Sequence, residues 1–117
     1  PESIDHLLVG CVFAREFWCT LLGQVNVQEL APQPGEEKAM EWWRRVSVQV
    51  QGIAEKGLNT LIIIGFWTIW NHRNSGVFDK ITPSVNVAIR RAEEERELWE
   101  MAGAKSLSLL TARIPGL

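Results

Sequence analysis

The chain has 117 residues, 46% hydrophobic and 22% charged, and its formal net charge at pH 7 is −2. This length and balance predict one globular domain with a core of its own and exclude a disordered chain. The negative charge argues against a dedicated, sequence-independent nucleic-acid binder, because neutralising phosphates requires a surplus of Lys and Arg.

Six Trp, four Phe and no Tyr form a skewed aromatic set, which predicts a core or an interface built on indole rings. Two cysteines, Cys11 and Cys19, are too few for a disulfide scaffold and are typical of an intracellular protein. The first residues, "PESIDHLLVGC", carry acids where a secretory signal has positive charge. Pro1 suggests a start in mid-chain. We therefore expect an intracellular protein, nuclear or cytoplasmic, without a signal peptide.

Two helices are expected in residues 1–23. Residues 3–10 are predicted to form a short helix with Ser3 as its N-cap. From Phe13 onward apolar residues recur at helical spacing, and Gly23 closes this amphipathic helix. Residues 24–36 contain two prolines and a glycine close together and are predicted to form a loop.

The next segment, up to Ile53, fits two patterns. Its apolar residues Ala39, Trp42, Trp43, Val46, Val50 and Ile53 fit a helical stripe. Val46, Val48 and Val50 alternate as in a strand, but the acidic start after Pro34 and Gly35 favours a helix. Gly57 is predicted to break the chain.

Leu58–Asn74 is predicted to form a central helix buried on most sides, because apolar residues cover nearly its whole circumference. Trp67 and Trp70 share one face, a spacing that we interpret as core packing. Basic residues and then Gly76 predict the end of the helix. The apolar run Leu61–Trp70 is about half the length that a bilayer requires, so we expect no membrane-spanning segment.

After Pro83 a long helix is predicted to about Ala102, and the tail 104–117 is expected to add one short helix. Its apolar stripe consists of Val85, Ala88, Ile89, Ala92, Trp99 and Ala102. The whole pattern predicts an all-α fold, a single compact domain over 1–117 with four to five helices around a Trp-rich core. Residues 37–117 are expected to form its helical core.

His6 and Cys11 form a His-x4-Cys pair, and imidazole and thiolate are both zinc ligands. Because a structural zinc takes four protein ligands, the spacing alone favours a surface histidine and a buried cysteine. Cys19 and His72 are the only other candidate ligands, and Cys19 lies on the polar side of its predicted helix.

The last predicted helix carries five glutamates and three arginines over residues 90–100, including Glu94 and Glu95. Carboxylates on successive turns of one helix diverge, whereas metal-dependent phosphoryl chemistry needs them to converge. The i,i+4 pairs Arg90–Glu94, Arg91–Glu95 and Arg96–Glu100 favour a solvated face, which could also be a partner surface.

The cluster His72, Arg73 and Asn74 could contact phosphates or bases, with Trp70 stacking on a base. The negative net charge favours a helix C-terminus whose basic side chains complement the dipole.

Trp42 and Trp43, followed by Arg44 and Arg45, have the composition of an interface hot spot. Core tryptophans followed by solvated arginines are the simpler interpretation of these four residues.

No motif predicts catalysis. The sequence has no Gly-x-Ser-x-Gly elbow, no phosphate-binding glycine loop and no conventional pairing of Cys with His. We therefore expect no enzyme and name no catalytic residue.

Two sets of residues nevertheless resemble a known family. One is Glu2-x3-His6-x4-Cys11 followed by Phe13-Ala14-Arg15 and Trp18; the other is Trp67-x2-Trp70-x2-Arg73-Asn74-x3-Phe78. In this order they resemble the reverse-transcriptase zinc-binding domain that follows the reverse transcriptase in plant non-LTR (LINE-type) retrotransposon polyproteins. The resemblance covers nearly the whole chain.

The resemblance implies that His6 and Cys11 are zinc ligands, completed in the family by an upstream Cys-x2-Cys pair. This chain lacks those two cysteines, so no cofactor is expected in it. A zinc ion is expected only if the full protein supplies the two cysteines upstream. The catalytic domains of the polyprotein are also missing from the chain. The segment "VSVQVQGIAEKG" departs from the family pattern, in which a proline is common.

Two functions are considered from these observations. The first is a noncatalytic, domesticated transposon domain acting as a protein-interaction module, by binding a protein partner or by self-association. The second is an accessory nucleic-acid-binding domain of a retroelement reverse transcriptase, which the net charge does not favour. The predicted interaction surface comprises Trp42, Trp43, Arg44, Arg45, Arg73, Glu94, Glu95 and Trp99.

Overall fold

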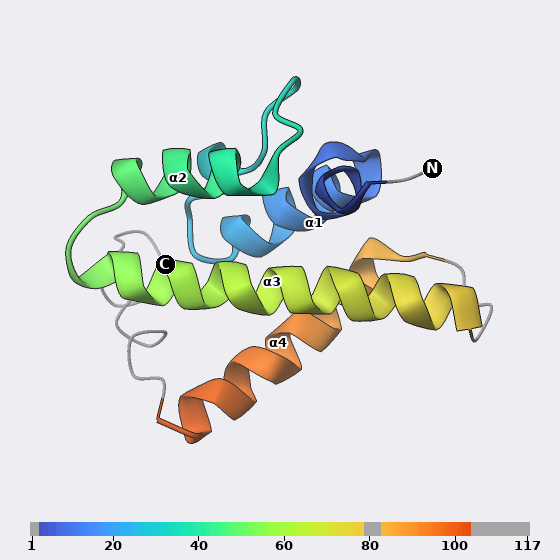
Figure 1. The fold of residues 1–117 in the computed structure, drawn as a ribbon. Coiled ribbons are helices and arrows are strands. Elements are labelled where there is room, and N and C mark those ends of the chain that lie inside the picture. Colours follow the sequence, from blue (N-terminus) through green and yellow to red (C-terminus); the bar gives the residue numbers. More distant parts are fainter. Residues whose placement is uncertain (1–2, 79–82, 104–117) are drawn as a thin grey trace.

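The computed structural model describes residues 3–78 and 83–103, and these residues are mostly helical (Figure 1). Its elements are a π-helical turn η1 (His6–Gly10), α1 (Val12–Gly23), a 3-10 turn η2 (Gln28–Leu30), α2 (Ala39–Gln49), α3 (Ile53–Phe78) and α4 (Val85–Met101). No strand occurs in these residues, so the predicted all-α fold is confirmed. The short helix expected in the tail lies outside the described residues.

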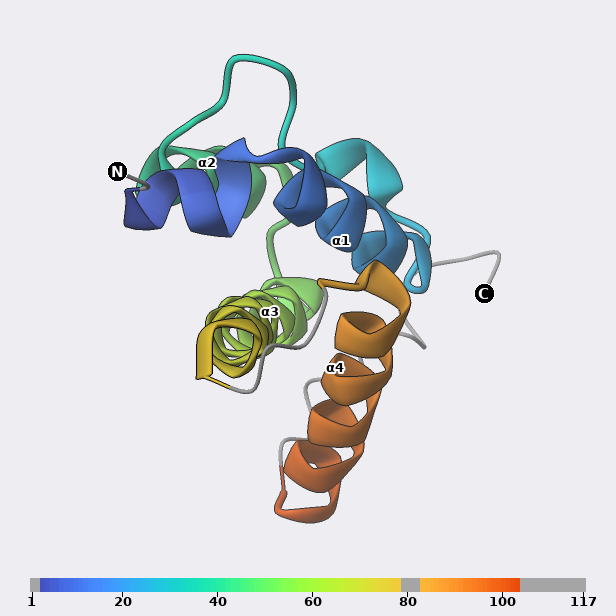
Figure 2. The same ribbon diagram turned by 90° about the vertical axis from the view of Figure 1, so that its right-hand side faces the viewer.

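Helix α3 is the axis of the molecule (Figure 1). Helix α2 lies along one side of it together with η1 and α1, and α4 crosses on the opposite side. Figure 2 looks along α3 and shows α4 running away from the rest of the chain towards its C-terminal end. The buried cluster takes side chains from all four α-helices and from the loop after α1, so these elements share one core.

The N-terminal elements follow the predicted pattern. Ser3 Oγ accepts the backbone N–H of His6 at 3.0 Å, as expected of an N-cap. Helix α1 then begins at Val12, and its buried side chains recur at helical spacing as predicted.

The segment before α3 is helical, as favoured, but the break after it was assigned to the wrong glycine. Helix α2 ends at Gln49, and the chain turns at Gly52, whose φ of +89° is unfavourable for residues with a Cβ. Gly57 lies inside α3, and the helix also continues past Gly76 to Phe78. A glycine inside a helix costs only about 1 kcal/mol, which the burial of neighbours such as Leu58 outweighs.

The Trp-rich core is confirmed. Trp18 and Trp42 are both 0% exposed, and their ring centroids lie 4.7 Å apart. Trp18 packs directly against the backbone of α3 at Gly65, where an added Cβ would lie 2.6 Å from Cζ3 of Trp18. Phe66 completes the cluster with an edge-to-face contact to Trp18 at 5.3 Å.

Helix α4 is buried only in its first half. Ala88, Ile89 and Ala92 are buried as predicted, whereas Trp99 is 36% exposed and Ala102 is exposed. The predicted stripe fails there because α4 diverges from the rest of the chain (Figure 2). Within the described residues, no helix is both long enough and apolar enough to cross a membrane.

Candidate functional site

Among the side chains of α3 that the structure describes, the most exposed large apolar ones are Ile63, Trp67 and Trp70, which we call the open face. Their side chains are 43%, 53% and 43% exposed. At i, i+4 and i+7 they form one stripe along the helix, on the side opposite the buried Leu61 and Gly65. The interpretation of Trp67 and Trp70 as core packing was therefore wrong.

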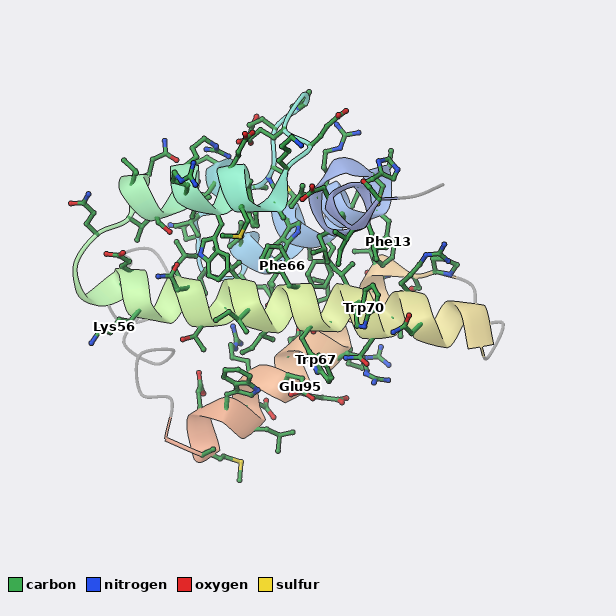
Figure 3. The ribbon with its side chains drawn as sticks, viewed as in Figure 1. Phe13, Lys56, Phe66, Trp67, Trp70 and Glu95 are labelled. Atoms are coloured by element: carbon green, nitrogen blue, oxygen red, sulfur yellow. The ribbon has the colours of Figure 1, made fainter. Side chains whose placement is uncertain are left out.

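Neighbouring helices explain why this side remains open. Helix α1 with η1, α2 and α4 each pack against α3, and Figure 1 shows α2 and α4 on opposite sides of it. The apolar residues of α3 surround the helix, but the neighbours cover only part of that circumference. The remaining part is the open face, which Figure 3 shows at Trp67 and Trp70.

The tryptophans of the open face also differ from the core tryptophans in hydrogen bonding. The indole N–H of Trp18 donates to the carbonyl of Leu8 at 2.8 Å, and that of Trp42 to the carbonyl of Leu30 at 2.8 Å. Throughout residues 3–78 and 83–103, no such bond is found for Trp67 or Trp70. The open face thus offers two ring systems and two N–H donors to a binding partner.

Charged side chains lie on α3 and on its neighbour α4. Glu95 lies on α4, which packs against α3, and Lys56 lies towards the N-terminal end of α3 (Figure 3). Arg91 acts on His72, which faces Phe13 and Ser84 rather than the open face. The three i,i+4 ion pairs predicted along α4 do not form within ion-pair distance in the described part of that helix. Its glutamates Glu94 and Glu95 therefore keep their charge available to solvent.

His72 makes contacts that hold parts of the fold together. It lies six residues before the end of α3, so the predicted position at a helix C-terminus was wrong. Its Nε2 accepts the backbone N–H of Ser84 at 3.0 Å, and its ring stacks on Phe13 with centroids 5.3 Å apart. Burial lowers the pKa of His72, and the charge of Arg91 lowers it further. These contacts favour the neutral imidazole, which connects α3 to the start of α4.

A cavity of about 270 Å³ lies next to this histidine. It is lined by Leu7, Cys11, Phe13, Ile69, His72, Arg73 and Pro83. Its walls are mainly apolar, and His72 already uses Nε2 for Ser84. The cavity therefore belongs to the packing of η1 and α1 on α3.

One of the two predicted zinc ligands, Cys11, already makes local structural contacts. Cys11 is the N-cap of α1, where its Sγ accepts the N–H of Ala14 at 3.3 Å and its thiol donates to the carbonyl of Leu7 at 3.8 Å. His6 is exposed on η1. In the described ranges, no His, Cys, Asp or Glu joins them in a group of three, whereas a structural zinc takes four ligands. The described residues therefore do not fit a zinc site by themselves.

The predicted surface on α2 is only partly available. Trp42 is 0% exposed and cannot belong to a surface, and Trp43 is half-buried with its N–H donating to Oδ1 of Asn59 at 2.7 Å. Arg44 is exposed, but Arg45 is engaged by Glu36, with Nε and Oε2 2.7 Å apart.

The ion pair of Arg45 closes the loop before α2. Burial alone would raise the pKa of the Glu36 carboxyl, but hydrogen bonds from Arg45 and the Gln33 N–H, with the charge of Arg45, lower it. Arg45 also donates to the carbonyl of Leu30 at 3.2 Å. These contacts assign Arg45 to the structure of the loop.

The structure separates the predicted surface residues. Trp43 and Arg44 lie on α2, whereas Glu94, Glu95 and Trp99 lie on α4, on the other side of α3 (Figure 1). The open face of α3 was not predicted. The helical spacing of Ile63, Trp67 and Trp70 was visible in the sequence. Because apolar residues occur all around α3, however, the sequence did not indicate which side of the helix the neighbouring helices leave uncovered.

No protein-family model, curated protein or solved structure matches this chain.

Proposed function

We propose that the chain is a noncatalytic, retrotransposon-derived module that binds a protein partner through the open face of α3. The observation that carries this proposal is the exposed stripe of Ile63, Trp67 and Trp70. Tryptophan is enriched among residues that dominate binding energy, and a contiguous exposed apolar patch on a monomer is often functional.

Charge supports a protein partner over a nucleic acid. The net charge of the chain is −2, and α4, which packs against α3, carries Glu95 and four other glutamates over residues 93–100. A phosphate backbone would be repelled by this carboxylate and by the other glutamates of α4.

The second candidate is an accessory nucleic-acid-binding domain of a retroelement reverse transcriptase. One observation favours it: Trp70 is exposed, and the basic side chain of Arg73, three residues further along α3, is exposed as well. Exposed indoles stack on bases, and arginines contact phosphates.

The first experiment compares these two candidates directly. Fluorescence anisotropy of the chain is measured with labelled single- and double-stranded RNA and DNA, at low and at near-physiological salt. A protein-binding module should show no nucleic-acid binding that persists at near-physiological salt. Binding that persists there and is lost in Trp70→Ala would overturn the proposal in favour of the second candidate.

The protein partner is sought by affinity capture with the wild-type chain and the double variant Trp67→Ala/Trp70→Ala. Val48→Ala is the matched control, because Val48 is 65% exposed on α2, away from the open face. A captured protein supports the proposal when, after purification, it binds the wild type and the control but not the double variant.

A further inference from the structure

We infer that the partner of the open face is an extended, proline-containing protein segment that carries a basic side chain. This inference rests on the proposed function of the same face and specifies the chemistry of its partner. Three features of the structure lead to it: the size of the face, its hydrogen-bond donors and the charge of the neighbouring α4.

The open face is small. A large aromatic side chain presents roughly 150–250 Å² when fully exposed, so the exposed parts of Ile63, Trp67 and Trp70 add up to roughly 300 Å². A stable protein–protein interface covers about 800 Å² on each partner. The face therefore fits a short segment better than a second copy of the chain or another folded domain.

A partner that covers the face has to replace the water around its N–H donors with acceptors of its own. The N–H groups of Trp67 and Trp70 have no acceptor in the described part of the chain. A helix or a sheet uses its backbone carbonyls internally, whereas a polyproline II segment has no internal hydrogen bonds and leaves its carbonyls free. Proline-rich segments dock on aromatic-lined grooves in this way, with little loss of conformational entropy.

The charge of α4 specifies a basic residue. Residues 93–100 of α4 contain five glutamates and one arginine, a net charge of −4. Glu93 accepts a hydrogen bond from Gln24 at 2.7 Å. In the described region, Glu94 and Glu95 are in no ion pair or hydrogen bond, and they lie on α4, the helix that packs against α3. A lysine or arginine of the bound segment would pair with these carboxylates.

The test uses three synthetic probes: decaproline with one terminal arginine, the same peptide with alanine in place of every proline, and decaproline with a terminal glutamate. Binding is followed by NMR of the tryptophan indole N–H signals, which reports each side chain separately. The arginine probe should shift the signals of Trp67 and Trp70 and leave those of Trp18 and Trp42 in place.

The expected affinities follow from the same contacts. Trp67→Ala and Trp70→Ala should each weaken binding of the arginine probe by about tenfold or more. Glu95→Gln should weaken it by about threefold, the size typical of an exposed ion pair, and Glu29→Gln, an exposed glutamate on η2, should leave it unchanged. Val48→Ala is the control for the tryptophan variants.

The outcomes separate the inference from the proposed function. Equal binding of the proline and alanine probes, or no binding of either, would overturn the polyproline inference. The proposed function would then stand if a purified protein partner still depends on Trp67 and Trp70. A nucleic acid that shifts the same two indole signals at physiological salt would overturn both.

Discussion

The six tryptophans form two groups with different surroundings. The inner group, Trp18, Trp42 and Trp43, lies between α1, α2 and α3, and each indole N–H in it donates to an acceptor of the chain. The outer group consists of Trp67, Trp70 and Trp99, which are 53%, 43% and 36% exposed. Over the described ranges, their N–H groups donate to no acceptor.

The difference shows what each group can contribute. A buried indole contributes burial energy when its N–H is also satisfied, which is the situation of the inner group. An exposed indole has little effect on the stability of the monomer, because most of its surface stays in contact with water. The inner group is thus expected to determine folding, and the outer group, under the proposed function, to determine binding.

The largest expected effect comes from removing an inner ring. Trp18→Ala would leave a cavity between α1 and α3 and remove the hydrogen bond to the carbonyl of Leu8. The free energy of unfolding should fall by about 3–5 kcal/mol, a large part of the stability of a small domain. Urea denaturation followed by circular dichroism measures this loss, and a loss below about 1 kcal/mol would show that the inner group is not the core.

The next effect tests the close packing of the Trp18 ring against the backbone of α3 at Gly65. Gly65→Ala would place a Cβ against the ring of Trp18, so we expect a loss of about 1–3 kcal/mol or more. Gly23→Ala, at the end of α1, is the control, because its Cβ would lie 3.8 Å from Cβ of Gln28, an ordinary contact. The two variants are compared in the same thermal unfolding experiment. Similar stabilities would contradict the packing of Trp18 on Gly65.

A smaller effect involves the junction between α3 and α4. The pKa of His72 is lowered in the folded chain by burial and by Arg91, so unfolding takes up a proton as the pH falls below the ordinary histidine value of about 6.5. Stability is therefore fully present above this value and decreases as the pH falls towards the folded pKa. Unfolding measured between pH 8 and pH 5 should show this decrease. His72→Gln should flatten it, and His6→Gln, on exposed η1, should retain it.

The smallest effect on stability is expected in the outer group. Trp67→Phe and Trp70→Phe should each change the free energy of unfolding by no more than about 0.5 kcal/mol. Each should, however, remove part of the fluorescence that acrylamide quenches, whereas Trp18 and Trp42, which are 0% exposed, are shielded from the quencher. A large loss of stability in either variant would show that the open face is part of the core.

Part of the fold followed from local patterns. The stripe that begins at Phe13 and the signals around Pro83 predicted α1 and α4 to within about two residues. The end of α2 could not be predicted from local patterns, because either Gly52 or Gly57 could break the helix as far as the sequence shows. Only the left-handed φ at Gly52 distinguishes the glycine that turns the chain from the one inside a helix.

The candidate site followed from the sequence less well. The hot-spot composition around Trp42 indicated a surface, but Trp42 is buried. The exposed Trp67 and Trp70 were interpreted as core. Tryptophan suits both environments, since its large apolar ring favours burial and its N–H favours a polar neighbour. Composition alone therefore could not assign the six rings to the inside or the outside.

The sequence by itself determined that this chain is all-α, that its core contains tryptophan, and where most of its helices lie, because helical periodicity and capping act over a few residues. The tertiary structure decided which side of α3 remains open and that Cys11 caps α1. It also decided that α4 leaves the core after Ala92. These properties depend on which helices pack against which sides of α3, and those contacts join residues far apart in the chain.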